Sequence, residues 1–158
     1  MEKQKENSLY LRCVTPADRE LLYLWCNDPQ CRANSLNPAM ISYEEHCRWF
    51  SRKMSSEDCY IYIFMNGESA VGQVRLDLEE NVGTISYSIA ADYRGRGLGY
   101  QMLQMLEEVM PQRVETLHAV VKEENTASQR CFEKLGYQKE EDERVSHYWK
   151  TKKLPSEG

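Results

Sequence analysis

Hydrophobic and polar residues alternate in several short segments of the chain, a pattern typical of strands with one buried face. In the segment 84–90, Ile85, Tyr87 and Ile89 would lie on one face and hydroxyl side chains on the other. The same pattern predicts further strands at residues 9–14, 58–65, 70–78, 117–121, 137–141 and 145–150. The chain is therefore expected to contain about seven strands.

Other segments repeat their hydrophobic residues every three or four positions, which predicts four amphipathic helices. One follows residues 15–18, one follows the capping box of residues 42–45, one runs from 98 to 109, and one follows Asn125. The segment 30–41 is rich in Asn and Pro and is expected to be a loop. The predicted order places two helices between the first strand and a three-strand meander.

At 158 residues, the chain is long enough for one domain with a substantial core. We expect this domain at residues 8–154, with tails at 1–7 and 155–158. The formal net charge of −5 argues against nucleic acid or a membrane surface as a partner. No apolar run is long enough to span a bilayer and the first residues are polar, so a cytoplasmic location is expected.

The six cysteines are expected to be reduced in that compartment. None of them forms a C-x-x-C pair, and only three histidines are present. No spacing typical of zinc ligands results. We therefore expect no bound metal.

A glycine-rich turn lies between the strand at 84–90 and the following helix. It reads Arg94-Gly95-Arg96-Gly97-Leu98-Gly99. Glycine allows a ligand to approach the backbone closely, and the free N–H groups of a helix start attract anions. The two arginines would add mobile positive charge. With the next strand, the turn belongs to a β-α-β unit and is predicted to bind a phosphate or pyrophosphate.

Two common nucleotide-binding patterns do not fit this turn. The dinucleotide pattern G-x-G-x-x-G would need glycine at the positions of Tyr100 or Met102, and the Walker pattern would need a lysine that is absent. What fits is R-x-x-G-x-G at Arg94, Gly97 and Gly99. This motif resembles the acetyl-CoA pyrophosphate motif of the GCN5-related N-acetyltransferases, the GNAT superfamily.

A second segment, from Asn125 to Tyr137, is similar to the N-x-x-A/S…Y/F…K-x-G-F/Y segment of the same superfamily. The resemblance implies an N-acetyltransferase that uses acetyl-CoA as co-substrate. It also implies the acetyl-CoA-binding residues Ser88, Ile89, Arg94, Gly95, Arg96, Gly97, Leu98, Gly99, Tyr100, Asn125, Ser128 and Phe132.

The predicted order of elements is also that of the GNAT fold. The resemblance therefore implies an α/β (α+β) fold with a mixed, mostly antiparallel sheet of about seven strands. A central β-α-β coenzyme unit and four helices would complete it.

The sequence departs from the family at one catalytic position, because Phe132 stands where the family usually has a tyrosine that protonates the departing CoA thiolate. Phenylalanine has no proton to give. We predict Tyr137 as the substitute acid and Tyr148 as the next candidate. Candidate bases are His46, Glu45 and Asp77. A catalytically silent acetyl-CoA-binding module is an alternative.

The amino-terminal half is expected to select the acceptor. Its W-x-N-D-P-x-x-R-x-x-S and E-x-H-x-x-W-F patterns are similar to N-acetyltransferases of nucleotide-amino-sugar pathways, above all that of pseudaminic acid biosynthesis. This resemblance implies that the partner is a small amine, a UDP-linked amino sugar. The implied substrate-binding residues are Trp25, Asn27, Arg32, His46, Trp49 and Arg75.

Each of these residues also has a purely structural interpretation. Trp25 and Trp49 could belong to the core or its rim, and His46 lies on an apolar helix stripe. Arg32 could be a surface charge rather than a ligand of the diphosphate. Enzymes that acetylate ribosomal-protein N-termini share parts of the same segment, so a protein N-terminal acetyltransferase is an alternative. The chain is expected to be a monomer or a homodimer.

Overall fold

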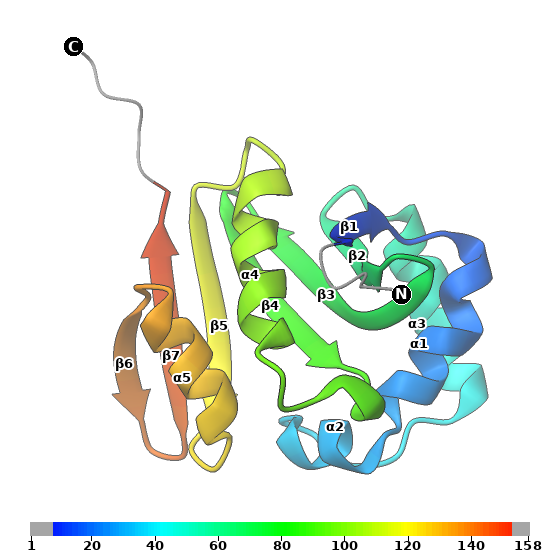
Figure 1. Ribbon diagram of the computed structural model, residues 1–158, viewed down its shortest axis with the longest axis horizontal. Helices are drawn as coiled ribbons and strands as arrows, with labels where there is room; N and C mark the ends of the chain where they lie inside the picture. Colours follow the sequence, from blue (N-terminus) through cyan, green and yellow to red (C-terminus); the bar gives the residue numbers. More distant parts are fainter. Residues whose placement is uncertain (1–7, 153–158) are drawn as a thin grey trace, which may run out of the picture.

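The computed structural model of the protein describes residues 8–152. Its strands form one seven-stranded sheet in the order β1-β2-β3-β4-β5-β7-β6 (Figure 1). The strands are β1 (Leu9–Cys13), β2 (Cys59–Asn66), β3 (Ser69–Glu79), β4 (Val82–Ile89), β5 (Thr116–Lys122), β6 (Gln138–Asp142) and β7 (Val145–Thr151). All neighbouring pairs are antiparallel except β4 and β5. The predicted mixed sheet is confirmed, while the tails predicted at 1–7 and 155–158 lie outside the described residues.

The helices are α1 (Arg19–Cys26), α2 (Pro29–Asn34), α3 (Tyr43–Ser55), α4 (Leu98–Val109) and α5 (Thr126–Lys134), with two short 3-10 turns, η1 (Pro16–Asp18) and η2 (Ala91–Tyr93). The described part thus has five α-helices rather than the four expected. Within residues 8–152, no helix combines the length and apolar character needed to cross a bilayer.

The additional helix is α2, in the segment that was expected to be a loop. The side chain of Asp28 accepts hydrogen bonds from the N–H groups of Gln30 (3.0 Å) and Cys31 (3.2 Å), and Pro29 occupies the first turn. Asp28 and Pro29 come shortly after the end of α1. They are also a good helix start, because a capping aspartate followed by proline satisfies the first turn.

Two hydrophobic cores lie on opposite faces of the sheet, because side chains along β2 alternate between them. Tyr62 and Phe64 belong to the larger core, to which α4 and α5 contribute. Ile61 and Ile63 belong to the smaller core, which also holds Leu22 of α1 and Phe50 of α3. The helices α4 and α5 therefore cover one face, and α1 and α3 cover the other face at the β2 side.

The parallel pairing of β4 with β5 is short. It joins only Val82–Thr84 to Thr116–His118, although β4 continues to Ile89 and β5 to Lys122. Beyond these three pairs the strands separate toward their carboxyl ends, as Figure 1 shows. Within the described chain, the end of β4 therefore has a backbone edge with no strand beside it, next to the turn that leads into α4.

Candidate functional site

The free edge of β4 presents backbone groups that could pair with an extended ligand. Along a strand, the N–H groups of successive residues point alternately toward the antiparallel partner and away from it. Just after β4, Ala90 donates its N–H to the carbonyl of Val71 in β3 (2.8 Å). By this alternation the N–H groups of Tyr87 and Ile89 face away from β3, toward the gap beside β5. The N–H of Ser88 faces β3 instead. Ser88 and Ile89 were both predicted to bind acetyl-CoA. Of the two, only Ile89 points its N–H into the gap, and Tyr87 points its N–H there in place of Ser88.

The turn between β4 and α4 has the geometry of an anion site. Gly95 (φ 80°) and Gly97 (φ 76°) adopt left-handed backbone conformations that side chains rarely allow. A Cβ built on either would meet nothing within 4 Å, so the space beside them is open. Gly97 is the N-cap of α4, and no side chain in the described part of the molecule caps that helix. The first N–H groups of α4 are left for a bound anion.

The first turn of α4 has a packing role as well. A Cβ on Gly99 would lie 3.4 Å from the ring of Tyr87, so glycine allows α4 to approach β4 closely. Leu98 packs against the larger core. Tyr100 lies under Lys134 of α5, whose Nζ is 4.7 Å from the ring centroid. These three residues, predicted to bind acetyl-CoA, are placed so that they also fix the position of α4.

Arg94 is not the mobile positive charge that the sequence predicted. Its Nη2 lies 2.7 Å from Oδ2 of Asp28, and its Nε donates to the carbonyl of Ile89 (2.9 Å). Because of these bonds, Arg94 ties the start of α2 to the end of β4. Arg96 is exposed and donates to the carbonyl of Asp92 (3.2 Å). Arg96 is therefore the arginine of this turn that is able to swing toward a phosphate.

The start of α5 brings polar groups close to β4. Asn125 caps the helix as predicted, since its Oδ1 accepts the N–H of Ser128 (3.2 Å). Ser128 is buried, and its hydroxyl lies 2.7 Å from the hydroxyl of Tyr87. Phe132 is 1% exposed and packs edge-on against the Tyr87 ring, with centroids 6.0 Å apart. Tyr87 thus places a hydroxyl beside the helix in which Phe132 stands where the resemblance would place a tyrosine.

Tyr137 is unsuited to the acid role predicted for it. Its hydroxyl is buried and has no hydrogen-bond partner among residues 8–152. Burial, followed by nearby Glu107, raises the pKa of Tyr137 far above its ordinary value. Tyr148 is also buried; its hydroxyl donates to Glu133 (3.1 Å), and burial and then Glu133 raise its pKa to about 12. The structure argues against both tyrosines as proton donors.

Polar side chains of two central strands form a strip on the face opposite α4 and α5. The polar strip consists of Gln73, Arg75 and Asp77 of β3 and Thr84, Ser86 and Ser88 of β4. Gln73 donates to Ser88 (3.1 Å), and Nη2 of Arg75 donates to Ser86 (3.2 Å). Asp77 accepts from both Arg75 Nε and Lys53 Nζ, each at 2.7 Å. Hydrogen bonds therefore hold most of the strip in a fixed arrangement.

Two of the predicted acceptor residues meet at this strip. The guanidinium carbon of Arg75 lies 5.1 Å from the ring centroid of Trp49, which comes from α3. Trp49 is partly exposed, although His46 stacks near its ring as well. Trp25 packs instead against the smaller core. The structure brings Arg75 and Trp49 together and leaves Trp25 as a core-rim residue.

Three other predicted acceptor residues have structural partners. Arg32 donates to the carbonyls of Cys26 (2.7 Å), Asn37 (3.0 Å) and Ala39 (2.9 Å). Its donors shape the segment between α1 and α3, which argues against the predicted contact with a diphosphate. Asn27 is held in the same segment, because its amide makes two hydrogen bonds to the backbone of Ile41 (2.8 and 2.9 Å).

His46 is a buried residue that joins two helices. It is 2% exposed, and its Nε2 lies 2.8 Å from the carbonyl oxygen of Arg19 in α1. Its ring stacks near Trp49 (5.7 Å) and Phe50 (6.0 Å). The catalytic and substrate-binding roles predicted for His46 do not fit this position, whereas the structural interpretation does.

The helix α2 bridges the separated ends of the two parallel strands. At its start, Asp28 is paired with Arg94, which follows β4. At its other end, the carbonyl of Ala33 accepts from Nζ of Lys122, the last residue of β5 (2.9 Å). Figure 1 shows α2 near the carboxyl end of β4. A ligand bound between the strands would therefore pass beside α2.

A pair of histidines near the polar strip was not singled out from the sequence. His118 of β5 and His147 of β7 lie side by side, with Nε2 and Nδ1 2.9 Å apart. Alternation in the strand at 117–121 already placed His118 opposite the core residues Leu117 and Ala119. The pairing of β5 with β7, which joins the two rings, could not be read from that pattern.

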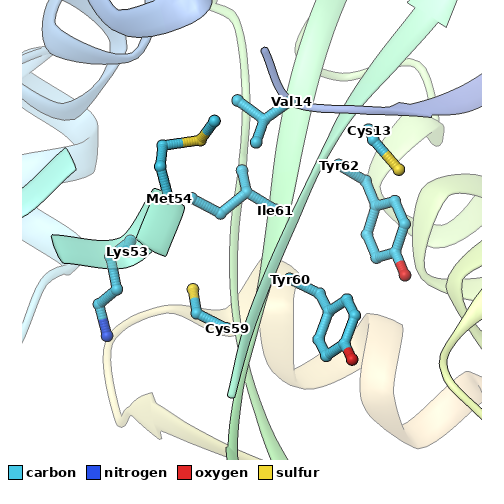
Figure 2. Close-up of a pocket in the computed structure, with 8 residues that line it drawn as sticks. All are labelled: Cys13, Val14, Lys53, Met54, Cys59, Tyr60, Ile61 and Tyr62. Carbon is cyan, nitrogen blue, oxygen red and sulfur yellow. The ribbon is translucent and has the colours of Figure 1, made fainter. Parts of the chain in front are cut away.

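A shallow hollow of about 190 Å³ lies elsewhere, at the edge of the sheet beyond the end of β1 (Figure 2). Its lining residues are Cys13, Val14, Lys53, Met54, Cys59, Tyr60, Ile61 and Tyr62. Neighbouring residues of β2 point to opposite faces of the sheet, so the hollow wraps around an edge. None of the residues predicted to bind acetyl-CoA lines it, although Lys53 also pairs with Asp77 of the polar strip.

Comparison with known families agrees with this geometry. Residues 8–138 match the model of the acetyltransferase (GNAT) domain. The match spans most of the chain and includes the glycine-rich turn, the polar strip and α5. The protein therefore belongs to the GNAT acetyltransferase family. It is an acetyl-CoA-dependent N-acetyltransferase, as the two motifs implied.

Solved structures of the same fold include enzymes with different acceptors. Spermidine N-acetyltransferase from Vibrio cholerae, in complex with CoA and spermine, superposes with a TM-score of 0.81 at 14% identity (92% of this chain, 96% of that one). An aminoglycoside acetyltransferase in complex with coenzyme A gives 0.76 at 19% (91% and 95%). RimL, which acetylates ribosomal protein L7/L12, gives 0.75 at 13% (94% and 96%). At these identities the likeness shows the fold alone. No curated protein sequence matches the chain.

Proposed function

We propose that the protein acetylates the primary amine of a nucleotide-linked amino sugar. In this proposal the pyrophosphate of acetyl-CoA lies on Gly95 to Gly97 and on the first N–H groups of α4. The pantetheine arm pairs with the free edge of β4 at Tyr87 and Ile89. Of these two groups, the N–H of Tyr87, which is farther from the glycine-rich turn, polarises the thioester carbonyl, while that of Ile89 holds the pantetheine arm.

The charge of the polar strip supports this choice of acceptor. Lys53 and Arg75 both pair with the single carboxylate of Asp77, so these three groups carry a net positive charge. A cationic surface favours an acceptor with phosphate groups and disfavours a polyamine. In this proposal the exposed part of Trp49, beside Arg75, contacts the sugar or the uracil.

The reaction requires the acceptor nitrogen to lose two protons and the CoA sulfur to gain one. The acceptor ammonium must lose a proton before its nitrogen attacks the thioester carbon. A C–N bond then forms, the C–S bond breaks, and CoA leaves as a thiolate. The nitrogen gives up its second proton, and the thiolate takes up one to leave as a thiol.

The proposal is tested by acetyl transfer to a panel of amines. Initial rates are measured with a UDP-linked amino sugar, spermine, an aminoglycoside and a peptide with a free amino terminus. We expect kcat/KM for the UDP-linked amino sugar to exceed the others by about tenfold or more, since one charge-assisted hydrogen bond contributes that much. If another amine is acetylated faster, that amine replaces the sugar nucleotide as the proposed acceptor. Free UDP should inhibit acetyl transfer only if the enzyme recognises the nucleotide.

A protein amino terminus is the second candidate acceptor. Three large hydrophobic side chains are exposed around α1 and the following segment: Leu24 (67%), Leu36 (63%) and Met40 (70%). Exposed apolar groups of this kind suit a polypeptide better than a sugar nucleotide. Faster transfer to the peptide than to the sugar nucleotide would favour this candidate.

Tyr87 is our candidate for the group that protonates the CoA thiolate. Its hydroxyl lies beside that of Ser128 at the start of α5, whereas that of Tyr137 is buried without a partner among residues 8–152. Burial raises the pKa of Tyr87 as well, so its place on β4 beside the proposed coenzyme gap, and not its acidity, makes it the candidate. We expect Tyr87→Phe to lower kcat about tenfold, a modest effect because a thiolate is already a good leaving group. Tyr137→Phe, the matched control, should leave kcat unchanged. Acetyl transfer is followed at saturating acetyl-CoA.

A rescue variant separates chemistry from packing. If Tyr87 supplies the proton, adding the family's tyrosine through Phe132→Tyr should restore part of the rate lost in Tyr87→Phe. A lower thermal midpoint with unchanged kcat in Tyr87→Phe would mean that this hydroxyl only stabilises α5. A slow Tyr137→Phe enzyme would return the acid role to Tyr137.

A further inference from the structure

Three polar side chains form a continuous line across the sheet from β4 to β7. The hydroxyl of Thr84 lies 3.2 Å from Nδ1 of His118, and Nε2 of His118 lies 2.9 Å from Nδ1 of His147. The two imidazoles are nearly parallel (11°), and Trp149 stacks on His118 at 4.1 Å. Stacking and strand pairing fix these rings, so the line is part of the folded structure.

The line begins where β4 and β5 separate. Thr84 and His118 are the last partners of their parallel pairing, and beyond them the gap between the strands opens. Thr84 also belongs to the polar strip, directly across from Asp77 of β3. The inner end of the line therefore lies between the gap proposed for acetyl-CoA and the surface proposed for the acceptor. Its outer end is on β7, near the edge of the sheet.

We propose that Thr84, His118 and His147 form a proton relay that removes a proton from the acceptor ammonium. The relay depends on the proposed acetyl transfer but not on which amine is the acceptor. It supplies the base that the central strand lacks, since β4 presents only hydroxyl groups on this face.

The hydrogen bonds of the line can all run in the same direction, from Thr84 to His147. Thr84 donates its O–H to Nδ1 of His118, and His118 donates its Nε2–H to Nδ1 of His147, whose own Nε2–H faces outward. The ammonium gives its proton to the Thr84 oxygen while the hydroxyl proton passes to His118. The Nε2 proton of His118 then passes to His147. One proton leaves toward solvent, and the neutral amine attacks the thioester.

Burial favours the neutral state of His118. Burial, and then the neighbouring His147, lowers the pKa of His118, while Glu140 of β6 opposes that shift. Glu140 also accepts a hydrogen bond from Trp149 Nε1 (3.3 Å). On the side of β3, Asp77 is already paired with Arg75 and Lys53. A neutral His118 can accept a proton at neutral pH, and the carboxylate of Glu140 can stabilise the charge that arrives at its neighbour.

The test is the pH dependence of acetyl transfer in single variants, with whichever amine the wild-type protein acetylates. His118→Gln keeps the size and polarity of the side chain but cannot carry a proton. We expect its kcat/KM at pH 7 to fall about 100-fold, and to rise tenfold per pH unit as the amine deprotonates by itself. The KM for acetyl-CoA should not change. Thr84→Val and His147→Gln should show the same change in pH profile with smaller losses.

A merely structural role predicts different results. Trp149→Phe, the control, disturbs the stack without removing a proton carrier and should keep the wild-type pH profile. Because the relay acts as a unit, His118→Gln combined with His147→Gln should be little slower than His118→Gln alone. An equal loss of rate at every pH, or additive losses in the double variant, would overturn the relay.

The remaining outcomes separate the relay from the acetyl transfer itself. An active wild-type enzyme whose pH profile survives His118→Gln and Thr84→Val would overturn the relay and leave the proposed function standing. A wild-type protein that acetylates no amine would overturn both. Imidazole nitrogen NMR gives a readout without turnover: Nδ1 of His118 should be unprotonated at pH 7, and a proton there would contradict the relay.

Discussion

Replacing Gly97 by valine is expected to abolish acetyl-CoA binding. Gly97 is the N-cap of α4, has a φ of 76°, and adjoins open space where a Cβ would meet no protein atom within 4 Å. A branched side chain there would take the place of the pyrophosphate beside the first N–H groups of the helix. Since several hydrogen bonds to the phosphates would be lost, we expect the Kd to rise by more than about 100-fold. Isothermal titration calorimetry with CoA measures the change.

A second glycine provides a matched control for backbone strain. Gly67, in the turn between β2 and β3, has a φ of 63° and likewise has nothing within 4 Å of a built Cβ. Valine at either position should cost about 1–3 kcal/mol of stability, because both force a side chain into the left-handed region. Only Gly97→Val should lose CoA binding. Normal binding by a folded Gly97→Val protein would place the coenzyme elsewhere, and equal losses in both variants would trace the effect to stability.

Local signals were sufficient to predict the backbone conformation of the glycine-rich turn and the cap of α5. Gly95 and Gly97 are needed for left-handed conformations within the short turn before α4, and Asn125 caps the helix that follows it, α5. Each of these roles depends on residues close together in the chain. The order of strands and helices was predicted for the same reason, because each element carries its own periodicity and its own caps.

The acceptor half depended on contacts between distant residues, and there the sequence was less informative. His46 was a candidate base until the fold placed it against the carbonyl of Arg19 in a neighbouring helix. Arg94 belonged to a recognisable motif, but its partner Asp28 lies 66 positions away. A side chain with a free charge and one with a buried partner look identical in a sequence.

The same limit explains why the histidine pair was missed. His118 and His147 are 29 residues apart and meet only because β5 and β7 are neighbours in the sheet. Their separation resembles no catalytic spacing, and neither residue lies in a GNAT motif quoted above. The relay is visible only when the strand order and register are known.

The helix α2 connects the coenzyme half of the site with the acceptor half. Its ends are tied to the turn after β4 and to the last residue of β5, on either side of the proposed coenzyme gap. The segment that continues from α2 to α3 is shaped by the hydrogen bonds of Arg32. We therefore expect changes in this segment to affect the acceptor more than the coenzyme, although no acceptor needs to touch Arg32.

Arg32→Ala is the prediction that tests this view. It removes three hydrogen bonds from a guanidinium to carbonyl groups, which should lower the free energy of unfolding by about 2–3 kcal/mol. It should also raise the KM of every acceptor by about tenfold, for sugar nucleotide and peptide alike, while the KM of acetyl-CoA stays nearly constant. Thermal unfolding and steady-state kinetics with both acceptors measure these effects.

Two further variants decide between a loop anchor and a diphosphate ligand. Arg32→Lys keeps the positive charge but loses the planar fork that reaches three carbonyls, so a loop anchor should not be rescued by lysine, whereas a phosphate contact should be rescued in part. Arg48→Ala removes an exposed arginine from α3 and should change stability by less than about 0.5 kcal/mol. If Arg32→Ala raised the KM of the sugar nucleotide alone and left the free energy of unfolding unchanged, Arg32 would contact the diphosphate directly. An equal rise in KM for both acceptors, with lower stability and no rescue by lysine, would establish that Arg32 acts through the shape of the segment between α2 and α3.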